Sequence, residues 1–227
     1  MTLQVIEVET APTPTASVIV LHGLGADGND FVPFAKELDL QTVGAVRFVF
    51  PHGPMRAVTI NGGNVMRAWY DIRGAELVAG GKAREDEAGL RESRALVEAL
   101  IVKERSRGVP ASRIVLAGFS QGCAMALMVG LRHEERLAGL LGMSGYLPLS
   151  ESTGAERHAA SVDVPVFLAH GSSDPVVPIA RAVASRDALV ALGHRVEWHT
   201  YPMGHSVCAK EVADVNHWLL QVLAPRT

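Results

Sequence analysis

The chain has 227 residues, a length at which folding buries roughly 70–75 % of the surface that the unfolded chain exposes, so one domain is the simplest expectation. With 48 % hydrophobic residues, 20 % charged residues and a formal net charge of −3, the composition is that of a soluble globular protein and excludes intrinsic disorder. Because the sequence contains no run of Lys or Arg, it offers no electrostatic attraction for nucleic acid or an anionic membrane surface.

In chain order, short apolar runs alternate with helical patterns. Strands are expected over residues 18–21, 46–50, 114–117, 137–143, 166–169 and 196–201. The clearest helix is expected over about 86–107, before Gly108 and Pro110 end it, and other helices are expected to begin near residues 30, 121, 179 and 210. Nearly continuous hydrophobicity is typical of strands that helices cover on both faces, so this order predicts an α/β fold with a mostly parallel central sheet.

Residues from about 51 to 81 interrupt this alternation within the expected single domain, 1–227. They contain many glycines, the large side chains Met55, Met66 and Trp69, and no clean period. The segment is expected to be a long functional loop.

Neither export nor membrane insertion is expected. The N-terminus carries Glu7 and Glu9 where a signal peptide needs a basic start and an apolar run, and no apolar stretch reaches the ~20 residues needed to span a bilayer. Cys123 and Cys208 are too few for a disulfide framework. We therefore expect a cytoplasmic protein with two small, buried cysteines.

The expected strand at 114–117 leads into Gly118-Phe119-Ser120-Gln121-Gly122 and then into a helix. A Gly-x-Ser-x-Gly turn in this context holds its serine in a strained conformation, and its glycines avoid steric clashes. The five-residue pattern alone arises often by chance, and a glycine-rich turn at a helix start is the alternative interpretation. The strand before it and the helix after it make Ser120 the candidate nucleophile.

A serine hydroxyl is a weak nucleophile at neutral pH, so it needs a histidine base that a carboxylate orients. Asp174 and His205 each follow an expected strand, which places both at the carboxyl edge of a parallel sheet. An Asp-Pro turn is the alternative for Asp174. His199 lies inside its strand and His194 lies before it, so both are poorer candidates for the base.

The same chemistry needs an oxyanion hole made of backbone N–H groups. Gln121 is expected to supply one of them because it follows the nucleophile, and Leu24 is expected to supply the other from the glycine-rich loop over residues 22–28.

Residues 23–28 also fit the Gly-x-Gly-x-x-Gly fingerprint of a dinucleotide site. That interpretation is disfavoured, because the next strand ends in Phe50-Pro51-His52 where the fingerprint needs an acidic residue. The nine histidines include no His-Glu-x-x-His motif, so neither a metal nor a cofactor is expected. His22, His52 and His170 are expected to be structural groups along the carboxyl edge of the sheet.

Together these motifs resemble the carboxylesterase and acyl-protein thioesterase group of α/β-hydrolases, over nearly the whole chain. The motifs that carry the resemblance lie at residues 21–31, 51–58, 61–63, 66–71, 118–122, 144–147, 170–178 and 201–205. The resemblance implies an α/β-hydrolase fold with Ser120, Asp174 and His205 as catalytic triad and Leu24 and Gln121 as oxyanion donors. Members of the group hydrolyse short- and medium-chain acyl esters, and some act on palmitoylated proteins or lysophospholipids.

The resemblance also implies an acyl-binding flap over residues 54–69, with Met66, Trp69, Val176 and Met203 as substrate contacts. The alternative is a loop that packs on its own core. Cys123 departs from the glycine that is common in the group at this position. It follows Ser120 by three residues, as Cys208 follows His205, and this spacing predicts that the two cysteines are neighbours.

The expected function is therefore a serine esterase that hydrolyses short- to medium-chain carboxylic esters, and thioesters, through an acyl-enzyme. The alternatives are an acyl-protein thioesterase or lysophospholipase as the main activity, and a non-catalytic binding protein on the same fold. The partner is a small acyl ester or an acylated protein or lipid. The sequence leaves the oligomeric state open, and the apolar flap offers one surface for a homodimer contact.

Overall fold

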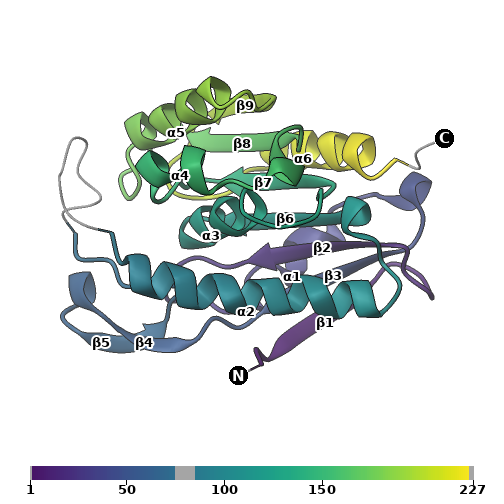
Figure 1. Cartoon of the computed structure of the whole chain (residues 1–227), viewed down its shortest axis with the longest axis horizontal. Coiled ribbons are helices and arrows are strands. Elements are labelled where there is room, and N and C mark those ends of the chain that lie inside the picture. Colours follow the sequence, from purple (N-terminus) through teal and green to yellow (C-terminus); the bar gives the residue numbers. More distant parts are fainter. Residues whose placement is uncertain (1, 75–84, 225–227) are drawn as a thin grey trace.

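The computed structural model describes residues 2–74 and 85–224, and a seven-stranded sheet runs through their centre (Figure 1). The strand order is β1–β3–β2–β6–β7–β8–β9. The strands span Val5–Glu9 (β1), Ala16–Leu21 (β2), Val46–Pro51 (β3), Ile114–Phe119 (β6), Gly139–Met143 (β7), Val166–Gly171 (β8) and Val196–Tyr201 (β9). Only β1 is antiparallel to its neighbour, so the expected mostly parallel sheet is confirmed.

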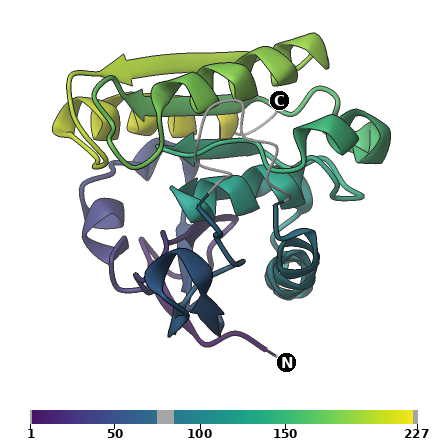
Figure 2. The same ribbon diagram turned by 90° about the vertical axis from the view of Figure 1, so that its left-hand side faces the viewer.

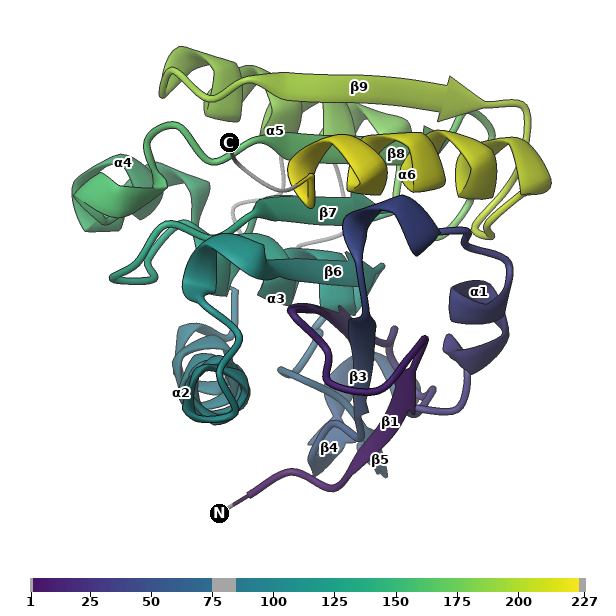
Figure 3. The ribbon, with the colours of Figure 1, turned by 90° about the vertical axis from the view of Figure 1, so that its right-hand side faces the viewer.

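Helices cover both faces of this sheet (Figure 3). They span Val32–Lys36 (α1), Glu87–Ser106 (α2), Gln121–Gly130 (α3), Ser150–Glu156 (α4), Ile179–Ala191 (α5) and Ala209–Val222 (α6). Short 3₁₀ turns lie at Gln41–Val43, Thr59–Asn61, Ala111–Arg113 and Ala159–Ser161. Apolar residues of α2, α3 and α5 pack in one core cluster, and those of α1 and α6 pack in a second cluster on the opposite face. Among the described residues, no helix is long and apolar enough to cross a bilayer.

Helix α2 shows why the local sequence gives this structure. Asp86 caps its N-terminus by accepting a hydrogen bond from the Gly89 N–H at 3.1 Å. Leu90, Val97 and Ile101 recur at helical spacing and are fully buried against the sheet. The chain leaves the helix at Gly108, whose φ of 92° suits glycine, so the expected helix over about 86–107 is confirmed.

The segment expected to be an irregular loop contains a β-hairpin. Strands β4 (Met55–Val58) and β5 (Asn64–Arg67) form a separate two-stranded sheet, on the side of the molecule where α2 begins (Figure 1, Figure 2). The expectation was wrong for these residues because both strands have only four residues and only Val58 among them is fully buried, so the sequence carries no run of alternating apolar residues. Residues 75–81 of the expected flap lie outside the described residues.

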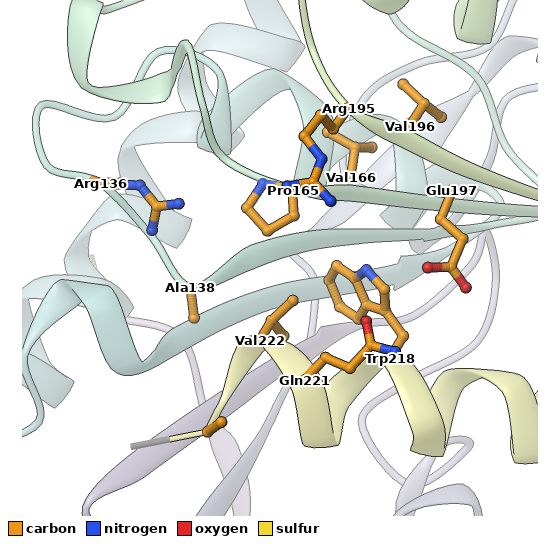
Figure 4. A pocket seen from close by; sticks show the side chains of 11 residues that line it. Arg136, Ala138, Pro165, Val166, Arg195, Val196, Glu197, Trp218, Gln221 and Val222 are labelled. Carbon is orange, nitrogen blue, oxygen red and sulfur yellow. The ribbon is translucent and has the colours of Figure 1, made fainter. Parts of the chain in front are cut away.

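A cavity of about 640 Å³ lies at the amino edge of the sheet, beside the first residues of β8 and β9 (Figure 4). Arg136, Arg195, Glu197 and Trp218 are among its lining residues. Enzymes built on open parallel sheets place their chemistry at the carboxyl ends of the strands, which form the opposite edge.

Glu211 gives the fold a testable pH dependence. Its carboxyl group lies in the first turn of α6 with an exposed fraction of 0 %. Burial raises the pKa of Glu211 from 4.5 to about 8, against the lowering effect of the Cys208 backbone N–H. Because the folded-state pKa lies above the unfolded value, the native protein binds this proton more tightly. The resulting stabilisation is complete below pH 4.5 and is lost as the pH rises towards 8.

Replacing Glu211 by Gln removes this titration. At about 1.4 kcal/mol per pKa unit, the free energy of unfolding of the unmodified protein falls by at most about 5 kcal/mol across this titration. Urea unfolding is measured between about pH 5 and pH 9. Over this range the free energy of unfolding should fall more steeply with rising pH in the unmodified protein than in Glu211→Gln. Replacement of the exposed Glu151 by Gln is the control and should follow the unmodified protein. Parallel curves for the unmodified protein and Glu211→Gln would contradict the prediction.

Candidate active site

The candidate residues gather where the strand order reverses. Strands β2 and β6 are paired neighbours, with Leu21 opposite Gly118. The chain continues from β2 to β3 on one side and from β6 to β7 on the other, so the loops that follow β2 and β6 diverge. Such a switch point opens a crevice at the carboxyl edge. Gly23 lies there directly against Ser120, because a Cβ atom on Gly23 would stand 3.4 Å from the Ser120 Cβ.

Ser120 occupies a sharp turn between β6 and α3. Its φ of 55° and ψ of −115° are unusual for a residue with a side chain. A Cβ atom on Gly118 would stand 2.2 Å from the Gly122 carbonyl, and one on Gly122 would stand 2.0 Å from the Leu21 carbonyl oxygen. Both glycines of the motif are therefore required by backbone contacts, and together they hold Ser120 at the end of the strand.

The Asp174 carboxylate and the His205 imidazole form a hydrogen-bonded pair. His205 Nδ1 lies 2.7 Å from Asp174 Oδ2, and the Asp174 side chain is fully buried. The other oxygen, Oδ1, accepts hydrogen bonds from the backbone N–H groups of Val176 at 2.8 Å and Val177 at 2.9 Å. The carboxylate is thereby fixed in orientation, and it orients the imidazole in turn.

Backbone contacts hold the loops that carry these two residues together. The Ser173 N–H donates to the Met203 carbonyl at 3.1 Å, and a Cβ atom on Gly171 would stand 2.2 Å from the Gly204 carbonyl oxygen. The His205 ring lies 4.7 Å from the ring of Phe119, the residue before Ser120. The structure thus brings the three predicted residues to one edge of the sheet.

The loop that carries Leu24 is held by buried polar contacts. His22 Nε2 accepts the Gly53 N–H at 2.9 Å, and the Trp69 indole donates to the His22 carbonyl at 2.9 Å. Burial lowers the pKa of His22, although the adjacent Gly23 carbonyl raises it, which favours the neutral ring that this acceptor role needs. The Gly25 N–H donates to the Arg67 carbonyl at 2.9 Å and ties the loop to the hairpin.

The side chain of Gln121 has a structural role that no local sequence pattern predicts. Its Oε1 accepts the Trp69 N–H and its Nε2 donates to the Tyr70 carbonyl, each at 2.7 Å. The residue after Ser120 is therefore bound to the chain segment that follows the hairpin. As the first residue of α3, Gln121 also has a backbone N–H without a partner inside that helix.

The predicted substrate contacts differ in exposure. Val176 is 48 % exposed, and Met66 and Met203 are half-buried, so all three present free surface. Trp69 is 0 % exposed, and its expected contact with substrate is not compatible with this burial. Its indole N–H instead holds the loop of Leu24 in place by donating to the His22 carbonyl. The resemblance to an acyl-binding flap implied a contact with substrate, whereas the tertiary structure uses the indole as an internal hydrogen-bond donor.

The prediction that Cys123 and Cys208 are neighbours was wrong. Cys123 is a residue of α3 and packs in the core cluster that α2 and α3 share, whereas Cys208 packs against the cluster on the opposite face of the sheet. Burial raises the pKa of the Cys123 thiol to about 12, so this thiol is unreactive at neutral pH. Gly142 and Gly145 make room for Cys123, since a Cβ atom on either would stand 2.4–2.6 Å from its side chain.

Comparison with known proteins identifies the same architecture. Residues 2–223 match the family model described as Phospholipase/Carboxylesterase. The chain is 40 % identical over 209 residues to acyl-protein thioesterase 1 of Yarrowia lipolytica, covering 90 % of this chain and 91 % of that protein. The crystal structure of Arabidopsis thaliana SOBER1 superposes with a TM-score of 0.86 at 28 % identity, covering 92 % of this chain and 99 % of that one. The crystal structure of Zea mays acyl-protein thioesterase 2 gives a TM-score of 0.84 at 27 % identity, covering 97 % and 99 %. The chain therefore belongs to the phospholipase/carboxylesterase family and is a hydrolase of the α/β-hydrolase fold that acts on ester bonds.

Proposed function

We propose that the chain hydrolyses short- to medium-chain carboxylic esters, and thioesters, through an acyl-enzyme formed on Ser120. The observation that carries the proposal is the 2.7 Å contact between His205 Nδ1 and Asp174 Oδ2, at the same sheet edge as the strained Ser120. An imidazole whose Nδ1–H is held by a carboxylate has Nε2 free as an acceptor. That tautomer is the one a general base needs.

In the proposed reaction, Ser120 Oγ attacks the carbonyl carbon while His205 Nε2 takes the hydroxyl proton. Asp174 stabilises the imidazolium that forms. The backbone N–H groups of Leu24 and Gln121 hold the developing oxyanion, and His205 then protonates the leaving alcohol or thiol. A water molecule repeats these steps on the acyl-enzyme, which releases the carboxylic acid and restores Ser120.

A thioesterase acting on S-acylated proteins is the second candidate for the main activity. It is favoured by the names of the curated relatives, since proteins from Yarrowia lipolytica and Neurospora crassa that are each 40 % identical to this chain are called acyl-protein thioesterase 1. Accessible apolar side chains beside the site fit an acyl substrate, namely Val176, two residues from Asp174, and the half-buried Met66, whose sulfur would lie 3.8 Å from a Cβ atom on Gly25.

A substrate series separates the two candidates. The value of kcat/KM is measured for aryl esters with acyl chains of two to sixteen carbons, and for a peptide whose cysteine carries the same acyl groups. An esterase should prefer the shorter aryl esters, whereas a protein thioesterase should prefer the long-chain S-acyl peptide. If no substrate is hydrolysed and a fluorophosphonate probe leaves Ser120 unlabelled, the chain is a binding protein on this fold and the proposal fails.

A further inference from the structure

A second buried histidine lies beside the proposed triad. His170 is the penultimate residue of β8 and is 0 % exposed. Its Nε2 lies 2.8 Å from the Val177 carbonyl oxygen and 3.4 Å from Asp174 Oδ2, the oxygen that also receives His205. Both of these neighbours are acceptors, so Nε2 must carry the hydrogen atom.

The other ring nitrogen shows that His170 is neutral. Within the part of the chain that the structure describes, the buried Nδ1 of His170 has no hydrogen-bond partner. The narrow crevice that His170 lines together with Leu168, Ala182 and Trp198, among others, has no room for a water molecule. A proton on Nδ1 would therefore be buried without an acceptor. Burial lowers the pKa of His170 in the same direction, although the Val177 carbonyl and Asp174 raise it.

An apolar residue would fill this position without leaving a buried nitrogen unpaired, so packing alone does not explain a histidine there. What the imidazole provides is one N–H group directed at the turn that carries Asp174. That turn has only three residues between Asp174 and Pro178, and its Val177 contributes both an N–H to Asp174 Oδ1 and a carbonyl to His170.

We propose that His170 is a positioning residue for the reaction: its Nε2–H donates to the Val177 carbonyl and lies 3.4 Å from Asp174 Oδ2, and in this way it holds the Asp174 turn in the orientation that directs Oδ2 at His205 Nδ1. Each oxygen of Asp174 then has its own set of neighbours. Oδ1 is held by the backbone N–H groups of Val176 and Val177, and Oδ2 lies between the two histidines. Because His170 stays neutral, it stabilises the carboxylate without placing a second positive charge beside the imidazolium of His205.

This inference rests on the proposed roles of Ser120, Asp174 and His205, and its test is a pair of substitutions. In His170→Met the new side chain has a volume similar to that of histidine but no hydrogen-bond donor. In His170→Gln the new side chain keeps an N–H group at a similar distance from the backbone. We expect His170→Met to lower kcat for an aryl ester by roughly 10- to 100-fold with little change in KM, because the imidazole of His205 is less well oriented. The low-field proton resonance of the His205 Nδ1–H should shift or broaden. His170→Gln should recover most of kcat and the resonance.

His194→Met is the matched control. His194 is also buried, and burial lowers its pKa, but it precedes β9 at the opposite edge of the sheet. Its replacement should leave kcat and the His205 resonance unchanged, whatever it does to the thermal unfolding temperature. A folded His170→Met protein with the unmodified kcat and resonance would overturn the proposal, and so would a folded His170→Gln protein that recovers neither.

A measurement on the unmodified protein covers the case in which a variant does not fold. The ¹⁵N shifts of the His170 ring should report a neutral imidazole with hydrogen on Nε2 throughout the pH range in which the protein is folded. Hydrogen on Nδ1, or titration near neutral pH, would refute the assignment. This result does not depend on turnover, so it distinguishes failure of the inference from failure of the proposed function.

Discussion

Replacement of Ser120 by Ala should lower kcat for ester hydrolysis by at least about 1,000-fold. The reason is chemical, since alanine has no oxygen to attack the carbonyl and no acyl-enzyme forms. The residual rate measures what the oxyanion donors and binding achieve alone. Alanine has the same Cβ atom as serine and tolerates the φ of 55° equally well, so the thermal unfolding temperature should change by only a few degrees. Steady-state kinetics and circular dichroism check the two expectations.

The control for this experiment is Ser106→Ala. Ser106 ends α2 on the surface, and its hydroxyl donates a local hydrogen bond to the Lys103 carbonyl. This variant should keep the full rate and remain labelled by a fluorophosphonate, whereas Ser120→Ala should not be labelled. Near-normal turnover in a folded Ser120→Ala protein would remove Ser120 from the mechanism and leave the fold assignment untouched.

Replacement of Asp174 by Asn should lower kcat by about 1,000- to 10,000-fold. The geometry predicts which way the amide will lie. The N–H groups of Val176 and Val177 both donate to Oδ1, so the amide oxygen must take that place and the NH₂ group must face His205. His205 Nδ1 then has to accept a hydrogen bond, which moves the ring proton to Nε2. A ring with hydrogen on Nε2 cannot take the proton from Ser120.

This variant needs a control that loses a carboxylate elsewhere. Asp163 is exposed before the start of β8 and pairs with Arg136 at 2.9 Å. Replacing Asp163 by Asn should leave kcat unchanged, because an exposed ion pair contributes little and lies at the opposite edge of the sheet. If Asp174→Asn and Asp163→Asn lose activity equally, then Asp174 has no special role in the reaction.

The order of the elements could be read from local patterns. Buried parallel strands give nearly uninterrupted apolar runs, and this pattern predicted β2, β3, β6, β7 and β8. Strand β9 was predicted as well, although it is mostly half-buried. The exceptions have physical causes. Strand β1 pairs along the sheet edge and is only half-buried, so its residues do not form an apolar run. Helix α4, over Ser150–Glu156, is too short and polar to show a helical period.

The candidate site was predictable for a related reason. Ser120, Asp174 and His205 each follow a strand, and the carboxyl ends of parallel strands share one edge. Residue type and position in the chain were therefore enough to choose Asp174 over Asp163, and His205 over His194 and His199.

The partners of these residues could not be read in the same way. Gln121 binds the backbone of Trp69 across 52 positions of the chain, and His22 binds Gly53 across 31. A hydrogen bond over such a distance depends on how two loops meet, which no local pattern encodes. The burial of Trp69 and the separation of Cys123 and Cys208 were misjudged for this reason.

The sequence by itself thus determined the α/β class, and it was enough to propose Ser120 as nucleophile and the chain order of the three candidate residues, because apolar runs and glycine spacing act over a few neighbouring positions. Only the tertiary structure decided which groups hold those residues in place. Strand order, the contact of the loops after β8 and β9, and the setting of His170 beside Asp174 depend on packing between segments far apart in the chain. Residue types alone leave such packing open, because one buried histidine or tryptophan can serve many different neighbours.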